Sequence, residues 1–293
     1  MFDKILFPTD GSDGAAVAFD HVLDVAHAHD ATVYVLNVAD TSRDSVTQIR
    51  GEVIDVLERE GATVVQEAAE RASARDVPAV TEVLQGEPYS TILDYATAND
   101  VDLIVMPTHG RRGLERFLLG STTERVVRRS EVPVLTVRPD DDVTVRHPYR
   151  SVLVPTDGSD PASAALDLAV DVARADEAAL HLLSVVDVAS LGVDVRADIA
   201  VDSLEESARE ILETAERTAA AAGVDPAATR VEFGTAIARA VRSYVADNDV
   251  DLIVVGTHGR TGFDRYVLGS VTEKLVRTAT VPVLTVRDTP DAS

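Results

Sequence analysis

The sequence contains no cysteine and no tryptophan, and only two of its 293 residues, Lys4 and Lys274, are lysines. The absence of cysteine excludes disulfides, thiolate metal sites and thiol catalysis. No uninterrupted apolar run approaches the roughly 20 residues that a membrane-spanning helix needs. The first ten residues, MFDKILFPTD, are acidic at position 3 and enter a strand-like run at once, which is not the pattern of a signal peptide. We therefore expect a cytoplasmic protein without a membrane segment.

Basic residues are also scarce, because 27 Lys and Arg stand against 50 Asp and Glu, a formal net charge of −23. A surface of this charge repels nucleic acid and anionic membranes, so neither is an expected partner. The acidic residues are spread along the chain. Together with the lack of lysine, this favours a halophilic protein, adapted to concentrated salt in which screening suppresses self-repulsion. The alternative is an ordinary acidic protein.

One unit occurs twice along the chain. PTDGSD stands at residues 8–13 and again at 155–160, and VPVLTVR stands at 132–138 and 281–287. This spacing is too long for a solenoid repeat and fits a duplicated domain of roughly 100–150 residues. The polar, proline-flanked stretch PDDDVTVRHPY reads as the linker. The predicted domains are residues 1–142 and 148–290.

Within each copy, short apolar runs alternate with helical patterns. Five runs of the first copy are rich in branched residues and bounded by turn signals, which predicts buried strands: KILFPT, TVYVLNV, AVTEVLQ, DLIVMPT and VPVLTV. Four segments between them have helical length and spacing: 14–28, 45–59, 89–99 and 121–130. In the second copy the clearest helix is 203–222, with Ser203 and Glu206 as its capping box. The alternation predicts an α/β chain of two tandem, doubly wound, Rossmann-like domains, each with a five-stranded parallel sheet.

A glycine-rich loop follows the fourth predicted strand in each copy. It reads GTHGRTGFDRYVLGS from Gly256 to Ser270 in the second copy and PTHGRRGLERFLLGS from Pro107 to Ser121 in the first. Glycines let backbone N–H groups approach a phosphate closely, and the start of the next helix favours an anion. In doubly wound sheets, ligands bind beyond the carboxyl ends of the strands. The spacing G-x2-G-x9-G-S differs from the two commonest nucleotide-binding motifs.

Basic residues gather around both loops, against the sign of the whole chain. Arg260 is one of them, and a phosphate chain approaching an acidic protein needs such local positive charge. The alternative is that these are solvated helix charges offset by the helix macrodipole.

These motifs resemble those of tandem universal stress proteins, and the resemblance covers nearly all of both copies. In that family, G-x2-G-x9-G-[ST] after the fourth strand and PTDGS after the first mark the nucleotide-binding members. The resemblance implies an adenine nucleotide alpha hydrolase-like fold that binds ATP or another adenine nucleotide, with Mg²⁺. In the second copy the residues expected at the nucleotide are Pro155, Thr156, Asp157 and Val185 on the nucleoside side, and Gly256, Gly259, Arg260, Gly269, Ser270 and Val271 at the phosphates.

The first copy departs from the pattern at one position. The corresponding residues are Pro8, Thr9, Asp10, Val38, Gly110, Gly120, Ser121 and Thr122. Pro107 replaces the glycine equivalent to Gly256, and proline has no N–H to donate and a fixed φ. A phosphate contact through that backbone position is therefore lost or reshaped. The sequence leaves open whether the first copy still binds a nucleotide.

Other candidate residues carry weaker signals. Asp10 and Asp157 have an alternative role as caps of the helices that follow them. His109 and His258 lie inside the loops and are expected to orient them, since no partner makes either a catalytic base. His21, His27 and His29 are too loosely spaced to predict a metal site. We therefore predict no catalytic residue and no protein-held metal.

The leading functional hypothesis is a stress-response protein that binds an adenine nucleotide and alters its binding to an unidentified protein partner. The alternatives are an interaction module without nucleotide and, less favoured, an adenylyl-transferring or slow ATP-hydrolysing enzyme, because no P-loop lysine or carboxylate pair is present. The apolar VPVLTV strands are poor exposed edges. The resemblance implies that they pair with each other in an intramolecular pseudo-dimer, with homodimerisation of the chain as a further option.

Overall fold

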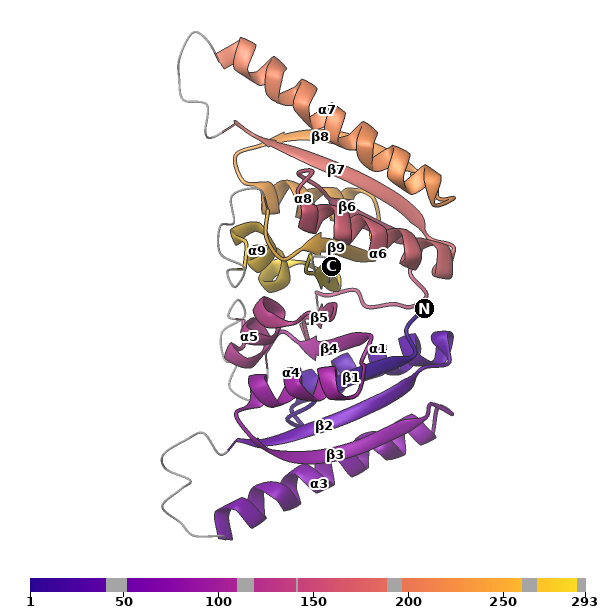
Figure 1. Cartoon of the computed structure of the whole chain (residues 1–293), viewed down its shortest axis with the longest axis vertical. Helices are drawn as coiled ribbons and strands as arrows, with labels where there is room; N and C mark the ends of the chain where they lie inside the picture. Colours follow the sequence, from indigo (N-terminus) through magenta and orange to yellow (C-terminus); the bar gives the residue numbers. More distant parts are fainter. Residues whose placement is uncertain (41–51, 110–118, 141, 189–196, 260–267, 289–293) are drawn as a thin grey trace. The chain divides into compact units, whose positions relative to one another are not determined.

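The computed structural model describes residues 1–40, 52–109, 119–140, 142–188, 197–259 and 268–288. The chain divides into two compact units, Met1–Pro148 and Tyr149–Ser293. Each unit is a parallel sheet with helices packed against it (Figure 1). The predicted fold class, two tandem doubly wound α/β domains, is confirmed. Among the described helices, none is both long and apolar enough to cross a membrane.

The first unit alternates strands and helices along the chain. Its elements are β1 (Lys4–Pro8), α1 (Asp13–His29), β2 (Thr32–Asp40), α3 (Glu52–Ser73), β3 (Ala79–Gly86), α4 (Pro88–Ala98), β4 (Leu103–Pro107), α5 (Ser121–Arg129) and β5 (Val134–Val137). The strand order is β3-β2-β1-β4-β5, and the described pairs are parallel. Arg71 of α3 and Arg75, two residues beyond its end, form ion pairs with carboxylates of α1, so these helices share one face of the sheet. Helices α4 and α5 pack together on the other.

The second unit repeats this arrangement. Its elements are β6 (Ser151–Pro155), α6 (Asp160–Asp176), β7 (Ala179–Asp187), α7 (Ala197–Ala221), β8 (Ala228–Gly234), α8 (Ile237–Asp247), β9 (Leu252–Gly256), α9 (Ser270–Thr278) and β10 (Val283–Val286). The strand order is β8-β7-β6-β9-β10, again with parallel pairs. Helices α6 and α7 contact each other, as do α8 and α9.

Strands β4 and β9 lack polar side chains because helices cover both of their faces. All five residues of β4 and all five of β9 are buried, as expected for parallel strands inside a doubly wound sheet. Helix α1 begins with a side-chain cap. Ser12 precedes α1, and its side chain accepts a hydrogen bond of 3.3 Å from the Ala15 N–H.

Two helix boundaries differ from the predictions. The helix expected at 45–59 ends at Ser73 and contains Gly61 in its interior. A Cβ at Gly61 would overlap the Asn37 side chain of β2, so this glycine allows close packing and does not end the helix. The helix expected at 203–222 begins at Ala197. Ser203 and Glu206 therefore lie inside α7, and the predicted capping box is wrong.

The strand order places the binding region of each unit. The first strand, β1 or β6, lies centrally, with the second and third strands on one side and the fourth and fifth on the other. The connections therefore change direction beside the first strand. This reversal is the topological switch point at which doubly wound sheets bind their ligands.

Candidate functional site

Strand β7 extends beyond the carboxyl end of β6, so backbone groups in the last part of β7 have no partner in β6 and can bond a ligand. The ladder between these strands ends at Pro155, paired with Leu183, and the Thr156 N–H donates to the Leu183 carbonyl over 2.8 Å. Strand residues two apart point their backbone groups to the same side. Val185 therefore directs its N–H and C=O toward the space beyond the end of β6. This is the geometry needed to hydrogen-bond a planar base.

Asp157 forms a turn directly after β6. Its Oδ1 accepts hydrogen bonds from the Ser159 N–H, over 3.1 Å, and from the Ser159 hydroxyl, over 2.6 Å. Gly158 between them has φ 73°, a conformation that glycine adopts without strain. The N-cap residue of α6 is Ser159, as Ser12 is that of α1. The capping role considered for Asp10 and Asp157 is therefore wrong, and the turn fixes the carboxylate at the strand end.

The glycine loop and the Asp157 turn meet in the second unit. A Cβ added to Gly259 would lie 2.6 Å from Asp157 Oδ2, so a larger residue there would displace this carboxylate. The motifs that follow the first and fourth strands, about 100 residues apart in sequence, therefore form one site.

Hydrogen bonds join the two ends of the glycine loop. The Gly269 N–H donates to the Thr257 carbonyl over 2.8 Å, and the Thr272 hydroxyl donates to the Gly256 carbonyl over 2.7 Å. The Gly269 N–H is thus engaged within the protein. Helix α9 begins at Ser270 without a side-chain cap, so the N–H groups of Ser270 and Val271 are the ones directed at an incoming anion.

The first unit has the same loop tethers despite Pro107. The Gly120 N–H donates to the Thr108 carbonyl over 2.7 Å, and the Thr123 hydroxyl donates to the Pro107 carbonyl over 2.9 Å. The Thr108 N–H donates to the Val137 carbonyl over 2.9 Å, as Thr257 donates to Val286. The proline therefore leaves the base of the loop unchanged.

The first motif of this unit is likewise retained. The Thr9 N–H donates to the Leu36 carbonyl over 2.9 Å, and Asp10 Oδ1 accepts from the Ser12 N–H over 3.0 Å. Pro8 ends β1, and Val38 lies two residues beyond Leu36 in β2, as Val185 lies beyond Leu183. Ser121 and Thr122 are the first residues of α5.

The glycine at position 256 has a packing reason of its own. A Cβ there would lie 2.7 Å from the carbonyl carbon and oxygen of Pro161, at the start of α6. Aligning the two PTDGSD motifs places Gly14 opposite Pro161 and Pro107 opposite Gly256. The two units therefore exchange proline and glycine between the strand end and the helix start. Gly256 therefore permits close contact with α6, and this packing role is independent of any contact with a phosphate.

The structure brings most of the expected residues to one end of each sheet. Gly110 and Arg260 lie outside the described residues. The threonines that tether the loops, Thr257 and Thr272 with Thr108 and Thr123, were missed at the sequence level. Their signal was present, because both loops contain the same letters, THG before the loop and GS-x-T after it.

The histidines of the loops are held by the preceding threonines. His258 Nδ1 lies 3.2 Å from the Thr257 hydroxyl, and His109 Nδ1 lies 3.1 Å from the Thr108 hydroxyl. These contacts agree with an orienting role.

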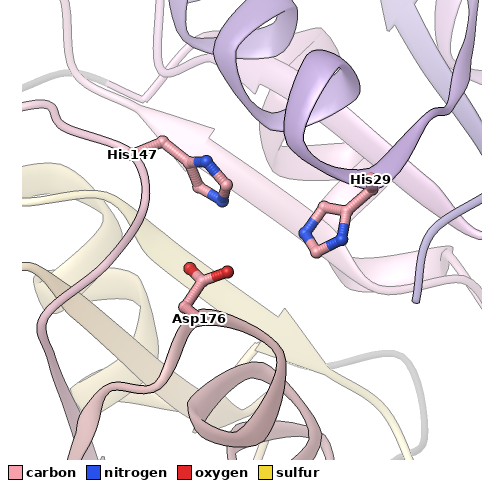
Figure 2. Close-up of side chains that lie close together, drawn as sticks. All are labelled: His29, His147 and Asp176. Carbon is pink, nitrogen blue, oxygen red and sulfur yellow. The ribbon is translucent and has the colours of Figure 1, made fainter.

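Two other histidines belong to an aromatic contact at the end of α1. The His29 and His147 rings, both drawn in Figure 2, have centroids 5.6 Å apart in an edge-on arrangement. The centroid of the buried His21 ring lies 6.2 Å from that of His147. In the second unit, Asp176, also drawn in Figure 2, accepts a hydrogen bond of 2.9 Å from the Tyr149 N–H. These contacts fix the ends of α1 and α6.

Comparison with known proteins identifies relatives over both units. The profile of the Universal stress protein family matches residues 1–138 and 148–287. A universal stress protein of Mycobacterium tuberculosis is 32% identical over 241 residues, which is 78% of this chain and 78% of the relative. One from Methanocaldococcus jannaschii is 38% identical over 141 residues, covering 47% of this chain and 83% of the relative.

One solved structure is similar to this chain over almost its full length. The crystal structure of a universal stress protein from Archaeoglobus fulgidus superposes with a TM-score of 0.74 at 25% identity. The match covers 97% of this chain and 98% of that chain.

Proposed function

Because the chain belongs to the universal stress protein family, we propose that its second unit binds ATP or a related adenine nucleotide and that occupancy regulates binding to a protein partner in the cytoplasm. The observation that carries this proposal is the close approach of Gly259 to Asp157. It joins a carboxylate suited to a ribose or purine hydrogen with a loop suited to phosphates.

Each part of the nucleotide has a matching protein group. The backbone of Val185 faces the space where a base would lie, and Asp157 accepts a hydrogen bond from a hydroxyl or amino group. The N–H groups of Ser270 and Val271, with the Ser270 hydroxyl, donate to phosphate oxygens at the positive end of α9. Mg²⁺ would enter with the nucleotide, held by its phosphate oxygens.

We extend the proposal to the first unit. The retained tethers of Gly120 and Thr123 support a binding-competent loop, because they form whether the preceding residue is proline or glycine. Pro107 removes one N–H, so the first site is expected to bind more weakly than the second.

The competing functions differ in what they require. An adenylyl-transferring or ATP-hydrolysing enzyme needs a base or electrophile beside the phosphates, and steady turnover with a cosubstrate would favour it. An interaction module without nucleotide would leave partner binding unchanged when the site is blocked.

The decisive test is Gly259→Asp, which introduces a carboxylate both against Asp157 and among the phosphates. We expect the affinity for ATP, measured by calorimetry with Mg²⁺, to fall by more than about tenfold, because like charges disfavour the complex. Gly110→Asp makes the matched change in the first unit, and Thr218→Asp on the exposed face of α7 controls for the added charge. Unchanged affinity in Gly259→Asp would remove the site assignment, and unchanged partner binding would remove the regulatory role.

Two further expectations remain proposals. We propose that the VPVLTV strands, β5 and β10, pair in a pseudo-dimer, in which case their amide hydrogens should exchange slowly in the full chain; fast exchange in both strands would contradict the pairing. We also propose adaptation to concentrated salt. A free energy of unfolding that does not rise with potassium chloride concentration would contradict that adaptation.

A further inference from the structure

A groove of about 330 Å³ lies between α8 and α9 of the second unit. Its lining includes the basic residues Arg239 and Arg242 from α8 and Lys274 from α9. Asp187 at the end of β7 is the single carboxylate among the described lining residues. Ser270 and Val271, at the start of α9, line the groove and also belong to the proposed phosphate site.

The three basic side chains of the groove have no acidic partner among the described residues. Within the described residues, neither Arg239, Arg242 nor Lys274 forms an ion pair or a side-chain hydrogen bond. All three are exposed. In a chain with 50 acidic and 27 basic residues, an unpaired cluster of this kind is unexpected, because a nearby carboxylate would ordinarily lower its energy.

Two helices begin at the same groove without side-chain caps. The N-cap residue of α8 is Ala236 and that of α9 is Gly269, and neither side chain can accept a hydrogen bond. The first N–H groups of both helices therefore lack side-chain acceptors, and both positive helix ends add to the field of the three cations.

In the equivalent region of the first unit, the basic side chains contact other side chains of that unit. Glu87 and Tyr89 stand where the second unit has Ala236 and Ala238. Arg125 is the residue equivalent to Lys274. Its Nη1 forms an ion pair with Glu87 Oε1 over 2.7 Å. Arg125 and Arg129 both lie over the Tyr89 ring, each 4.9 Å from its centroid. The first unit thus supplies these two arginines with partners of its own, a carboxylate and an aromatic ring.

We propose that the groove of the second unit is a binding site for phosphate groups, formed by Arg239, Arg242 and Lys274 together with the amino ends of α8 and α9. Guanidinium groups bind phosphate oxygens in pairs, and an ammonium group adds a point charge. The alanines at 236 and 238 leave open the space that a carboxylate and an aromatic ring occupy in the first unit. A phosphate-bearing ligand replaces that internal carboxylate.

The phosphates can come from two sources. One is the distal part of a nucleotide bound at the adjacent loop, since the groove shares Ser270 and Val271 with that site. The other is a separate phosphate-bearing molecule beside the nucleotide. In both cases the same three side chains are the receptors, and the experiment distinguishes the sources.

The test measures binding of tripolyphosphate to the full chain by calorimetry. The double variant Arg239→Gln/Arg242→Gln should weaken binding at least tenfold. Ala236→Glu, which copies Glu87 of the first unit onto an exposed position, should have a similar effect by supplying Lys274 with an internal partner. Arg209→Gln/Arg217→Gln on α7 removes the same charge away from the groove and should change the affinity less than twofold.

Competition with nucleotide assigns the source. If tripolyphosphate still binds to the ATP-saturated chain, the groove takes a separate molecule. In the other outcome, ATP displaces tripolyphosphate, and the groove variants lower the affinity for ATP but leave the affinity for AMP unchanged. The groove then binds the distal phosphates of the nucleotide. Gly259→Asp separates this proposal from the proposed function, because a variant without ATP binding should retain tripolyphosphate binding. No binding of tripolyphosphate, or equal affinity in groove and α7 variants, would overturn the proposal.

Discussion

The two units have the same order of strands and helices, but different residues form the equivalent packing contacts. At the junction of the fourth strand and the first helix, the second unit has Gly256 against Pro161, whereas the first unit has Pro107 and Gly14. The hydrogen bonds that tether the loop are the same in both. A substitution that looks like damage in one sequence motif can therefore be half of an exchange whose other half lies elsewhere in the chain.

Placing the proline of the first unit at the aligned position of the second, without the accompanying glycine, should have the largest effect on stability. Gly256→Pro would drive a pyrrolidine ring into the Pro161 backbone, where even a Cβ lies 2.7 Å away. We expect the free energy of unfolding of the second unit to fall by about 3 kcal/mol. Denaturant titration measures the change.

The compensating variant sharpens this prediction. Gly256→Pro combined with Pro161→Gly should recover part of the loss, with a coupling energy above about 1 kcal/mol. Strictly additive effects would show that the two positions do not compensate each other.

A smaller effect is expected where α3 crosses β2. Gly61→Ala places a Cβ against Asn37, whose side-chain amide donates to the Thr9 carbonyl over 2.8 Å. Overpacking should outweigh the roughly 1 kcal/mol gained from helix propensity, so we expect a net loss of about 1 kcal/mol in the free energy of unfolding. Thermal and denaturant melts report the difference.

The second unit has a different pair of residues at the equivalent contact between helix and strand, which suggests a control. It has Ser184 and the buried Ala208 at the equivalent positions. Adding Asn37→Ser to Gly61→Ala should therefore cost less than the sum of the single changes. A double variant that loses the full sum would show that the smaller side chain does not relieve the contact.

The smallest expected effect concerns pH. Burial lowers the pKa of His181, whose Nδ1 lies 2.9 Å from the Tyr244 hydroxyl. The folded chain therefore binds this proton less tightly than the unfolded chain does. Stability contributed by the neutral ring is complete above about pH 6.5 and is lost as the pH falls toward the lowered pKa of the folded state.

Replacing His181 with the residue of the first unit isolates this contribution. His181→Tyr copies Tyr34, whose ring lies edge-on to Tyr95 with centroids 6.4 Å apart. The fall in melting temperature between pH 7 and pH 5 should be shallower in the variant than in the wild type. If the melting temperatures of the variant and the wild type fall equally between pH 7 and pH 5, His181 does not contribute to the pH dependence of stability.

The fold was predictable because its signals are local. Runs such as KILFPT and DLIVMPT have consecutive apolar residues at their centres, and they form β1 and β4 as expected of strands covered on both faces. The end of α3 was not predictable, since Gly61 suggests a helix end until its contact with Asn37 is known. A glycine required by tertiary packing has the same sequence signal as one that ends a helix.

The candidate site divides in the same way. The family resemblance assigned Asp157 and Gly259 to one site, and the fold brings them close together because the carboxyl ends of parallel strands meet at one edge of the sheet. The groove was not predictable. Arg239, Arg242 and Lys274 come from two helices, and only the folded chain shows that they have no carboxylate partner among the described residues.

The two hydrogen bonds that join the ends of the glycine loop have an evolutionary consequence. Since Thr257 and Gly269 are bonded directly, the two ends of the intervening segment lie side by side. Changes in its length alter little beyond the closure entropy, which rises by only about 0.6 kcal/mol for each doubling of length. After duplication, each loop could therefore acquire new sequence and new ligands independently, while the sheet beneath it kept its structure.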